Sequence, residues 1–393
     1  RSRALAAAGQ LEPAMAIIQP VLSEVAAAGP ALTPEIAGWA GGGDTADDRQ
    51  KARVAGYAAA VDRARVETIL SAFRVRARQG NAAEAGKLLD LLIKAGGSLE
   101  NNLRPLEAVS RELAALKVLR EKEGKADEAK NIGVGLGVLL DKIRTVKDLS
   151  PATLLFVAQM LQAVGKNAEA LDTARKVPAP ALKDWDKKKP DEIPDTERGK
   201  TLNQIRDYAT AQHIAAKAMT ELKQYAEAEK MLKDIIPTQW GQVRLYFRQD
   251  LAHLYEAKAA GNNDTKAANA DWGLAFAEWR NLLTIHSNRL KTPPKDANMA
   301  QLRNAYADAY FEVKRCALTA NLKLLKEGSP ALQKTIDDVG KTFADMEKQI
   351  PAAEWEPDVQ NRYHELLKAH PQVMKVYEAA GGQLFKKKAE PKP

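Results

Sequence analysis

Gly165-Lys166-Asn167-Ala168-Glu169-Ala170 is the stretch that decides the fold, because near-copies of it recur along the chain. The other copies begin at Gly9, Gly80, Gly124 and Lys223. In every copy an apolar stretch with helical periodicity ends at the first residue, and another such stretch follows. Glycine suits the left-handed position that ends a helix. The repetition therefore predicts a series of helical hairpins, with this stretch at the corner of each.

Alanine follows each turn residue at the same distance. The five alanines are Ala14, Ala85, Ala129, Ala170 and Ala228. Two packed helices lie about 8–10 Å apart, and a small side chain at their crossing lets the backbones approach. We therefore interpret these alanines, with the turn glycines Gly9, Gly80, Gly124 and Gly165, as structural positions of the repeat.

The composition also favours helices. Alanine is abundant, and only 6% of the residues are aromatic, so the residue types that fill β-strands are scarce. A chain of 393 residues exceeds the usual size of a single core. We expect an all-α fold, an α-solenoid of stacked antiparallel helix pairs with irregular insertions.

Turn signals and changes in composition divide the chain into segments. In chain order we expect a truncated repeat at 1–28, a flexible insertion at 29–50, helical hairpins at 51–177, a charged proline-rich insertion at 178–200, a further hairpin at 201–237, degenerate hairpins with a C-terminal cap at 238–380, and a disordered basic tail at 381–393. Because the first residue is Arg1 and the chain opens within a helical pattern, we also expect a fragment or a processed product.

Several sequence features that could indicate a metal, nucleotide or disulfide site do not fit the pattern that such a site requires. His364 and His370 are six residues apart, whereas a zinc-binding helix places two histidines four residues apart. The glycine-rich run 133–138 resembles a nucleotide loop but lies within a helical pattern. Cys316 is the single cysteine, which excludes an internal disulfide. We therefore expect no metal, no cofactor, no small-molecule substrate and no enzymatic activity.

Two tryptophans and the cysteine are expected in the core. Trp272 and Trp279 lie seven residues apart on one helical stripe, which more often packs inside a protein than binds a ligand. Cys316 lies among leucines in a helical pattern, and we interpret it as a small buried residue.

The repeat resembles the tetratricopeptide repeat (TPR), whose period is about 34 residues. The positions that carry this resemblance are Leu161, Gly165, Ala170 and Val177; Phe73, Gly80, Ala85 and Leu92; and Ala216, Tyr225, Ala228 and Ile235. The turns are 71, 44, 41 and 58 residues apart, and the family's tryptophan near the start of the first helix is missing. The hairpins 238–380 match only as generic helical pairs.

This resemblance implies that the first helix of each pair lines a concave surface that binds a protein or peptide. Carried over copy by copy, it gives the candidate partner-binding residues Arg74, Arg78, Gln159, Gln162, His213 and Lys217. Arg3, Arg74 and Lys217 all lie six residues before their turn. Three basic residues at this position favour a partner with acidic segments.

These observations favour a non-catalytic protein–protein interaction scaffold within a larger assembly. The net charge of +8, from 59 basic and 51 acidic residues, leaves open a basic helical-repeat module that binds nucleic acid or another polyanion. A helical-repeat portion of a larger enzyme is a further alternative. No run approaches the ~18 apolar residues that a membrane span needs. The sequence leaves the compartment open, cytoplasmic or exported.

Overall fold

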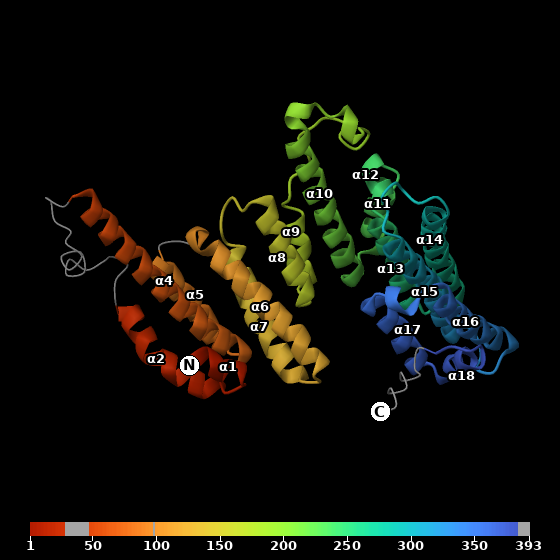
Figure 1. Cartoon of the computed structure of the whole chain (residues 1–393), viewed down its shortest axis with the longest axis horizontal. Helices are drawn as coiled ribbons and strands as arrows, with labels where there is room; N and C mark the ends of the chain where they lie inside the picture. Colours follow the sequence, from red (N-terminus) through yellow and green to blue (C-terminus); the bar gives the residue numbers. More distant parts are fainter. Residues whose placement is uncertain (28–46, 97–98, 384–393) are drawn as a thin grey trace. The chain divides into compact units, whose positions relative to one another are not determined.

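The computed structural model describes residues 1–27, 47–96 and 99–383, and within these ranges all regular structure is helical (Figure 1). The predicted all-α fold built from paired helices is confirmed. The helices up to residue 221 are α1 (Ser2–Ala7), α2 (Leu11–Ala27), α4 (Asp48–Arg78), α5 (Ala82–Gly96), α6 (Leu103–Lys122), α7 (Ala126–Ile143), α8 (Pro151–Ala163), α9 (Asn167–Ala174) and α10 (Asp195–Glu221). The later helices are α11 (Tyr225–Ile235), α12 (Gln239–Val243), α13 (Tyr246–Ala260), α14 (Thr265–Lys291), α15 (Met299–Leu324), α16 (Pro330–Gln349), α17 (Pro357–Ala369) and α18 (Pro371–Ala379). Short 3₁₀ turns lie at Glu100–Asn102, Pro190–Glu192 and Ala352–Glu354.

The chain forms two compact units. Unit 1 comprises Arg1–Ala181 and Leu202–Ala218, and unit 2 comprises Leu182–Thr201 and Met219–Pro393. Helix α10 therefore contributes residues to both units.

Unit 1 is built from helical hairpins. The pairs α1/α2, α4/α5, α6/α7 and α8/α9 each pack together, and α4 also packs against α2 and α7. One continuous apolar core runs through these pairs, with Phe73, Leu89 and Leu136 among its fully buried members. Each hairpin thus covers an apolar face of its neighbour, as in other helical repeats.

The five hairpin corners have the same geometry. Their turn residues have positive φ, with values of 81° at Gly9, 72° at Gly80, 73° at Gly124, 78° at Gly165 and 60° at Lys223. At each corner two backbone hydrogen bonds close the helix end. At Gly165, for example, its N–H donates to the Gln162 carbonyl (3.0 Å) and the Lys166 N–H donates to the Leu161 carbonyl (2.9 Å). This is the Schellman arrangement, which satisfies carbonyls that the helix end leaves unpaired.

The alanines that follow these corners are all buried, at 1% exposure or less. Each donates its backbone N–H to the residue that directly follows its turn residue, as Ala170 does to the Lys166 carbonyl (2.9 Å). The second helix therefore enters every hairpin with a buried alanine in its first turn.

Unit 2 has longer helices and more aromatic residues. Helices α13, α14 and α15 pack in succession, α16 packs against α15 and α18, and α17 packs against α15 and α18. Phe343 packs on Tyr363 at a ring-centroid distance of 4.4 Å. Trp272, Trp279 and Cys316 are buried, as the sequence led us to expect.

Of the three predicted irregular segments, 178–200 is fully described and the other two are described in part. In the insertion predicted at 29–50, residues 29–46 lie outside the described residues, and α4 already begins at Asp48 behind a capping box on Asp47. The insertion predicted at 178–200 is helical from Asp195 onward, since Asp195 and Glu197 supply favourable charges in the first turn of α10. Residues 384–393 of the tail lie outside the described residues.

The corner geometry predicts a specific glycine requirement. An added Cβ at Gly165 would touch no atom within 4 Å, so a Gly165→Ala change meets only the backbone penalty of φ +78°. We expect a loss of about 1–2 kcal/mol in the free energy of unfolding. Gly56→Ala is the matched control, because Gly56 has equally open surroundings inside α4. That change should stabilise by up to about 1 kcal/mol. Equal urea midpoints for the two variants would contradict the corner assignment.

Candidate functional site

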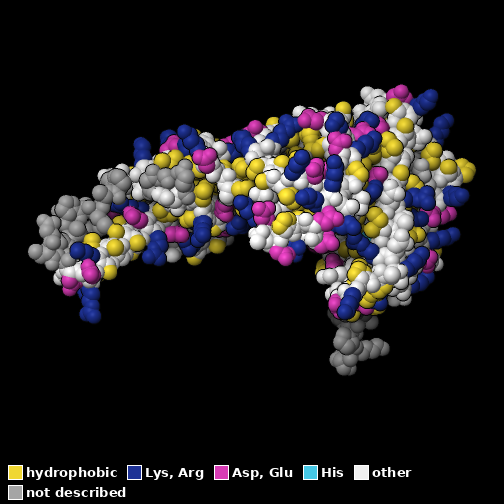
Figure 2. All heavy atoms as spheres, turned by 90° about the horizontal axis from the view of Figure 1, so that it is seen from above, with side chains coloured by type: hydrophobic (Ala, Val, Ile, Leu, Met, Phe, Trp, Pro, Cys, Tyr) yellow, Lys and Arg dark blue, Asp and Glu magenta, His cyan; other side chains and the backbone are white. Residues whose placement is uncertain are grey.

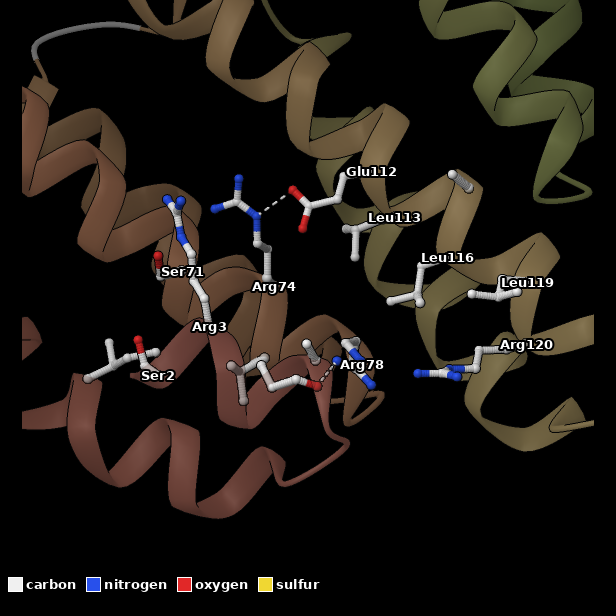
Figure 3. Close-up of a pocket in the computed structure, with 15 residues that line it drawn as sticks. Ser2, Arg3, Ser71, Arg74, Arg78, Glu112, Leu113, Leu116, Leu119 and Arg120 are labelled. Atoms are coloured by element: carbon white, nitrogen blue, oxygen red, sulfur yellow. Dashed lines mark hydrogen bonds and ion pairs between the residues drawn. The ribbon is translucent and has the colours of Figure 1, made fainter. Parts of the chain in front are cut away.

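A groove of about 620 Å³ lies in unit 1 between α1, α4 and α6 (Figure 3). These are the first helices of three successive hairpins. Helix α4 packs mainly against α5, α2 and α7 and only lightly against α6, which leaves space between the two first helices. The residues that line it are Ser2, Arg3, Ala6, Ala7, Ile18, Ser71, Arg74, Val75, Arg78, Glu112, Leu113, Ala115, Leu116, Leu119 and Arg120.

One wall of the groove is a leucine stripe on α6. Leu113, Leu116 and Leu119 are three residues apart and point toward the groove (Figure 3). Their exposure increases along the helix, because Leu113 is buried, Leu116 is half-buried and Leu119 is 48% exposed. An apolar side chain exposed within a groove offers free energy to a partner that covers it, about 25 cal/mol per Å² of apolar area.

Four arginines and one glutamate supply the charge of the groove. They are Arg3, Arg74, Arg78, Arg120 and Glu112. Arginine is the basic residue best suited to bind carboxylates, because its planar guanidinium presents several N–H donors in a fixed fork.

Arg78 is held inside the unit. Its side chain is 6% exposed, and its Nε and Nη2 donate to Glu128 Oε1 at 3.1 and 2.6 Å. Its Nη1 donates to the carbonyl of Ala6 near the end of α1, where a cation is favourable. Arg78 therefore joins α1, α4 and α7.

Arg120 shares the same acceptor. It pairs with Glu128 at 3.1 Å and with Glu123 at 2.5 Å. Because Arg78 lies on α4 and Arg120 on α6, Glu128 of α7 connects both walls of the groove. Glu128 does not itself line the groove.

Arg3 and Arg74 are paired differently. Arg3 contacts Glu67 at 2.5 Å in a pair that faces water on both sides. Arg74 crosses the groove from α4, and its Nε donates to Glu112 Oε2 on α6 at 2.8 Å (Figure 3).

The structure brings two of the six candidate residues together. Arg74 and Arg78 line the groove, whereas Gln159, Gln162, His213 and Lys217 do not. Gln159 and Lys217 are exposed, His213 is half-buried, and the Gln162 amide donates to the Ile214 carbonyl (3.4 Å).

Sequence reasoning missed Glu112 and Arg120. It assumed that every first helix turns the same face toward the groove. The positions five and nine residues before the corner line the groove on both helices. The other lining positions differ, since α4 adds those six and two residues before its corner, whereas α6 adds those twelve, eleven, eight and four residues before its own. Since neighbouring residues differ by about 100° around a helix, α6 is rotated relative to α4. A shared offset from the corner does not detect this rotation.

Unit 2 contains a second cluster of charged residues, which we interpret as structural. Glu256 accepts from Trp279 Nε1 (2.6 Å) and from Arg315 Nη2 (2.7 Å). Arg315 also contacts Glu312 at 2.6 Å, and Arg362 pairs with Glu312 and Asp308. These pairs connect α13, α14, α15 and α17, and each carboxylate has a cationic partner, as buried charges require.

A small cavity of about 110 Å³ adjoins this cluster. It is lined by Gln249, Trp279, Leu282, His286, Ala305, Asp308, Ala309 and Glu312. His286 Nδ1 is buried without a hydrogen-bond partner among the described residues. Burial and, to a smaller extent, the charge of Arg289 lower the pKa of His286 from about 6.5 to about 4.

This shift predicts acid sensitivity. The unfolded chain takes up a proton on His286 from about pH 6.5 downward, whereas the folded chain does so only at about pH 4. The free energy of unfolding should therefore fall between these values, by about 1–2 kcal/mol once exposure to water is allowed for. A His286→Gln variant should lose less stability over this range in urea melts at a series of pH values. Parallel curves for the variant and the wild type would refute the burial of a neutral histidine.

Two arginines of the groove should differ in how much they contribute to the free energy of unfolding. Arg78→Ala removes one partner of a buried ion pair and should lower the free energy of unfolding by about 3–5 kcal/mol. Arg3→Ala breaks an exposed pair on the same groove and should cost about 1 kcal/mol or less. Urea unfolding of both variants measures the difference. If Arg78→Ala melts like wild type, the guanidinium is not the clamp between α1, α4 and α7.

Within the described residues, no helix combines the length and the apolar character that crossing a bilayer requires. In the same ranges, no group of three or more His, Cys, Asp and Glu side chains is arranged to hold a metal ion.

The fold and the groove define an all-α protein of helical-hairpin repeats. No family model matches the chain, and no curated protein matches it. A search of solved structures gave a circular tandem repeat protein with novel repeat topology and enhanced subunit contact surfaces, 13% identical, with a TM-score of 0.25, over 97% of this chain and 90% of that chain. At that TM-score we draw no argument from the likeness.

Proposed function

We propose that the protein is a non-enzymatic interaction scaffold of the TPR-like kind, which binds a peptide segment of another protein on its first helices. The observation that supports this proposal is the groove between α1, α4 and α6, which has a leucine stripe beside several arginines. Its volume of about 620 Å³ lies within the range of about 300–1,000 Å³ typical of ligand sites.

The chemistry of the lining favours a protein ligand. Protein interfaces combine an apolar centre with a polar rim, and arginine is enriched at the positions that contribute most to affinity. Leu116 and Leu119 provide an apolar surface, and Arg74 lies opposite them on α4. A peptide with both apolar and acidic side chains would match this surface.

The alternative of polyanion binding has weaker support. The arginines of the groove are paired with carboxylates, which reduces the field that a phosphate backbone would meet. On the face seen in Figure 2, the described basic and acidic side chains are interspersed rather than gathered into a basic stripe.

An array of synthetic peptides that differ in charge and hydrophobicity tests the proposal. We expect the full chain to retain peptides that carry aliphatic and acidic residues, and Arg74→Glu to weaken their binding by about tenfold or more. Lys87→Glu is the matched control, because Lys87 is 73% exposed on the second helix α5. Its binding should equal that of wild type.

Two outcomes would contradict this function. One is that no peptide binds, or that Arg74→Glu and Lys87→Glu bind equally well. The other is binding of single- or double-stranded nucleic acid, but of no peptide, with an affinity that falls steeply with salt. That result would support the polyanion alternative instead.

A further inference from the structure

In the Arg74–Glu112 pair, one nitrogen of the arginine is left without an acceptor. An arginine can bind a carboxylate through two parallel N–H donors. Here Nε donates to Glu112 Oε2, while Arg74 Nη1 is buried and has no hydrogen-bond partner among the described residues. Glu112 therefore leaves Arg74 incompletely paired on a side chain that is 19% exposed, although the unpaired nitrogen is itself closed to solvent.

The carboxylate of this pair faces water. The Glu112 side chain is 56% exposed, so it can leave Arg74 and be solvated at little cost. An ion pair that is open to solvent on one side contributes little to stability. Glu112 is thus an exchangeable ligand of a well-placed arginine.

The other arginines do not offer the same opportunity. Arg78 is 6% exposed and uses all three of its nitrogens on Glu128 and Ala6. Arg120 also has a buried nitrogen without a hydrogen bond, Nε, but this atom lies 3.1 Å from Glu128, and the side chain pairs with Glu123 as well. Arg3 lies at the edge, in a pair that is exposed on both sides. Among the partly buried arginines of the groove, Arg74 is therefore the one whose carboxylate partner is most exposed and most readily displaced.

We propose that Glu112 occupies, in the unbound protein, the place on Arg74 that an acidic side chain of the partner takes on binding. The partner segment is an acidic peptide whose aliphatic side chains cover Leu116 and Leu119 while its carboxylate replaces Glu112. This inference rests on the proposed function. It adds that Glu112, a residue of the protein itself, competes with the partner's carboxylate for Arg74. Glu112 lowers affinity, and it favours partners whose carboxylate and aliphatic groups both fit.

The experiment uses two short fluorescein-labelled peptides, one in which leucine and aspartate are spaced by alanine and serine, and one in which asparagine replaces every aspartate. Fluorescence anisotropy at low salt measures their binding to the full chain. Glu112→Gln should raise the affinity for the aspartate peptide about twofold to fivefold, the change that removal of a competing surface pair gives. Arg74→Gln should lower that affinity, and the asparagine peptide should gain nothing from Glu112→Gln.

Glu84→Gln is the control for overall charge. It removes the same negative charge from unit 1, in the exposed Lys87 pair on α5. Affinity should stay at the wild-type value, and the gain in Glu112→Gln should shrink as salt is raised. Thermal melting confirms that all three variants are folded before their affinities are compared.

Three results would overturn the inference. Unchanged or weaker binding of the aspartate peptide to Glu112→Gln would show that Glu112 does not compete. An equal gain for both peptides would show that a carboxylate is not involved. Self-association of the free protein that Arg74→Gln removes, without peptide binding, would make a second copy of the chain the occupant. If neutral peptides of the array still bind and depend on Arg74, the proposed function stands although this inference fails.

Discussion

The repeated corner is the constraint on which the rest of unit 1 depends. A residue with positive φ ends the first helix, two backbone hydrogen bonds cover the free carbonyls, and the second helix starts immediately. A buried alanine then lets the helices lie close together. The chain thus reverses its direction within about six residues. The long side chains of the core, such as Phe73 and Leu136, then pack on helices whose relative position the corner has already set.

The same constraint determines where a binding surface can form. The corners are constrained by their backbone conformation and the crossing alanines by their burial, so the side chains that can differ from repeat to repeat lie on the outward faces of the helices. Between α4 and α6 these faces do not close on each other, because α4 packs on α5 and α7. The opening carries leucines and Arg120 on α6 and two further arginines, Arg74 and Arg78, on α4. The rotation of each helix about its own axis thus decides which polar and apolar side chains face the opening, while the corner stays the same.

The fold followed from the sequence because its signals are local. Glycine at a helix end and alanine five residues later are visible in a single stretch such as 165–170. Lys223 occupies the same position with φ 60° although it is not glycine, and only its register with the other copies reveals the corner. The groove was harder to predict, because it depends on the rotation of α6, and Glu112 and Arg120 are placed by that rotation. Gln159 and Lys217, chosen by the same offset as Arg74, lie outside the groove.

Glu128 has a consequence for how such a surface can change over evolution. It receives Arg78 from α4 and Arg120 from α6, yet it lies on α7 and does not line the groove. The two walls are therefore tied together from behind, by a residue that lies outside the groove. Because Arg78 is buried and needs a carboxylate partner, only a change that keeps the negative charge at this position could shift the walls while the leucines and arginines of the groove remain unchanged. New specificity in a helical array can in this way precede any substitution at the surface itself.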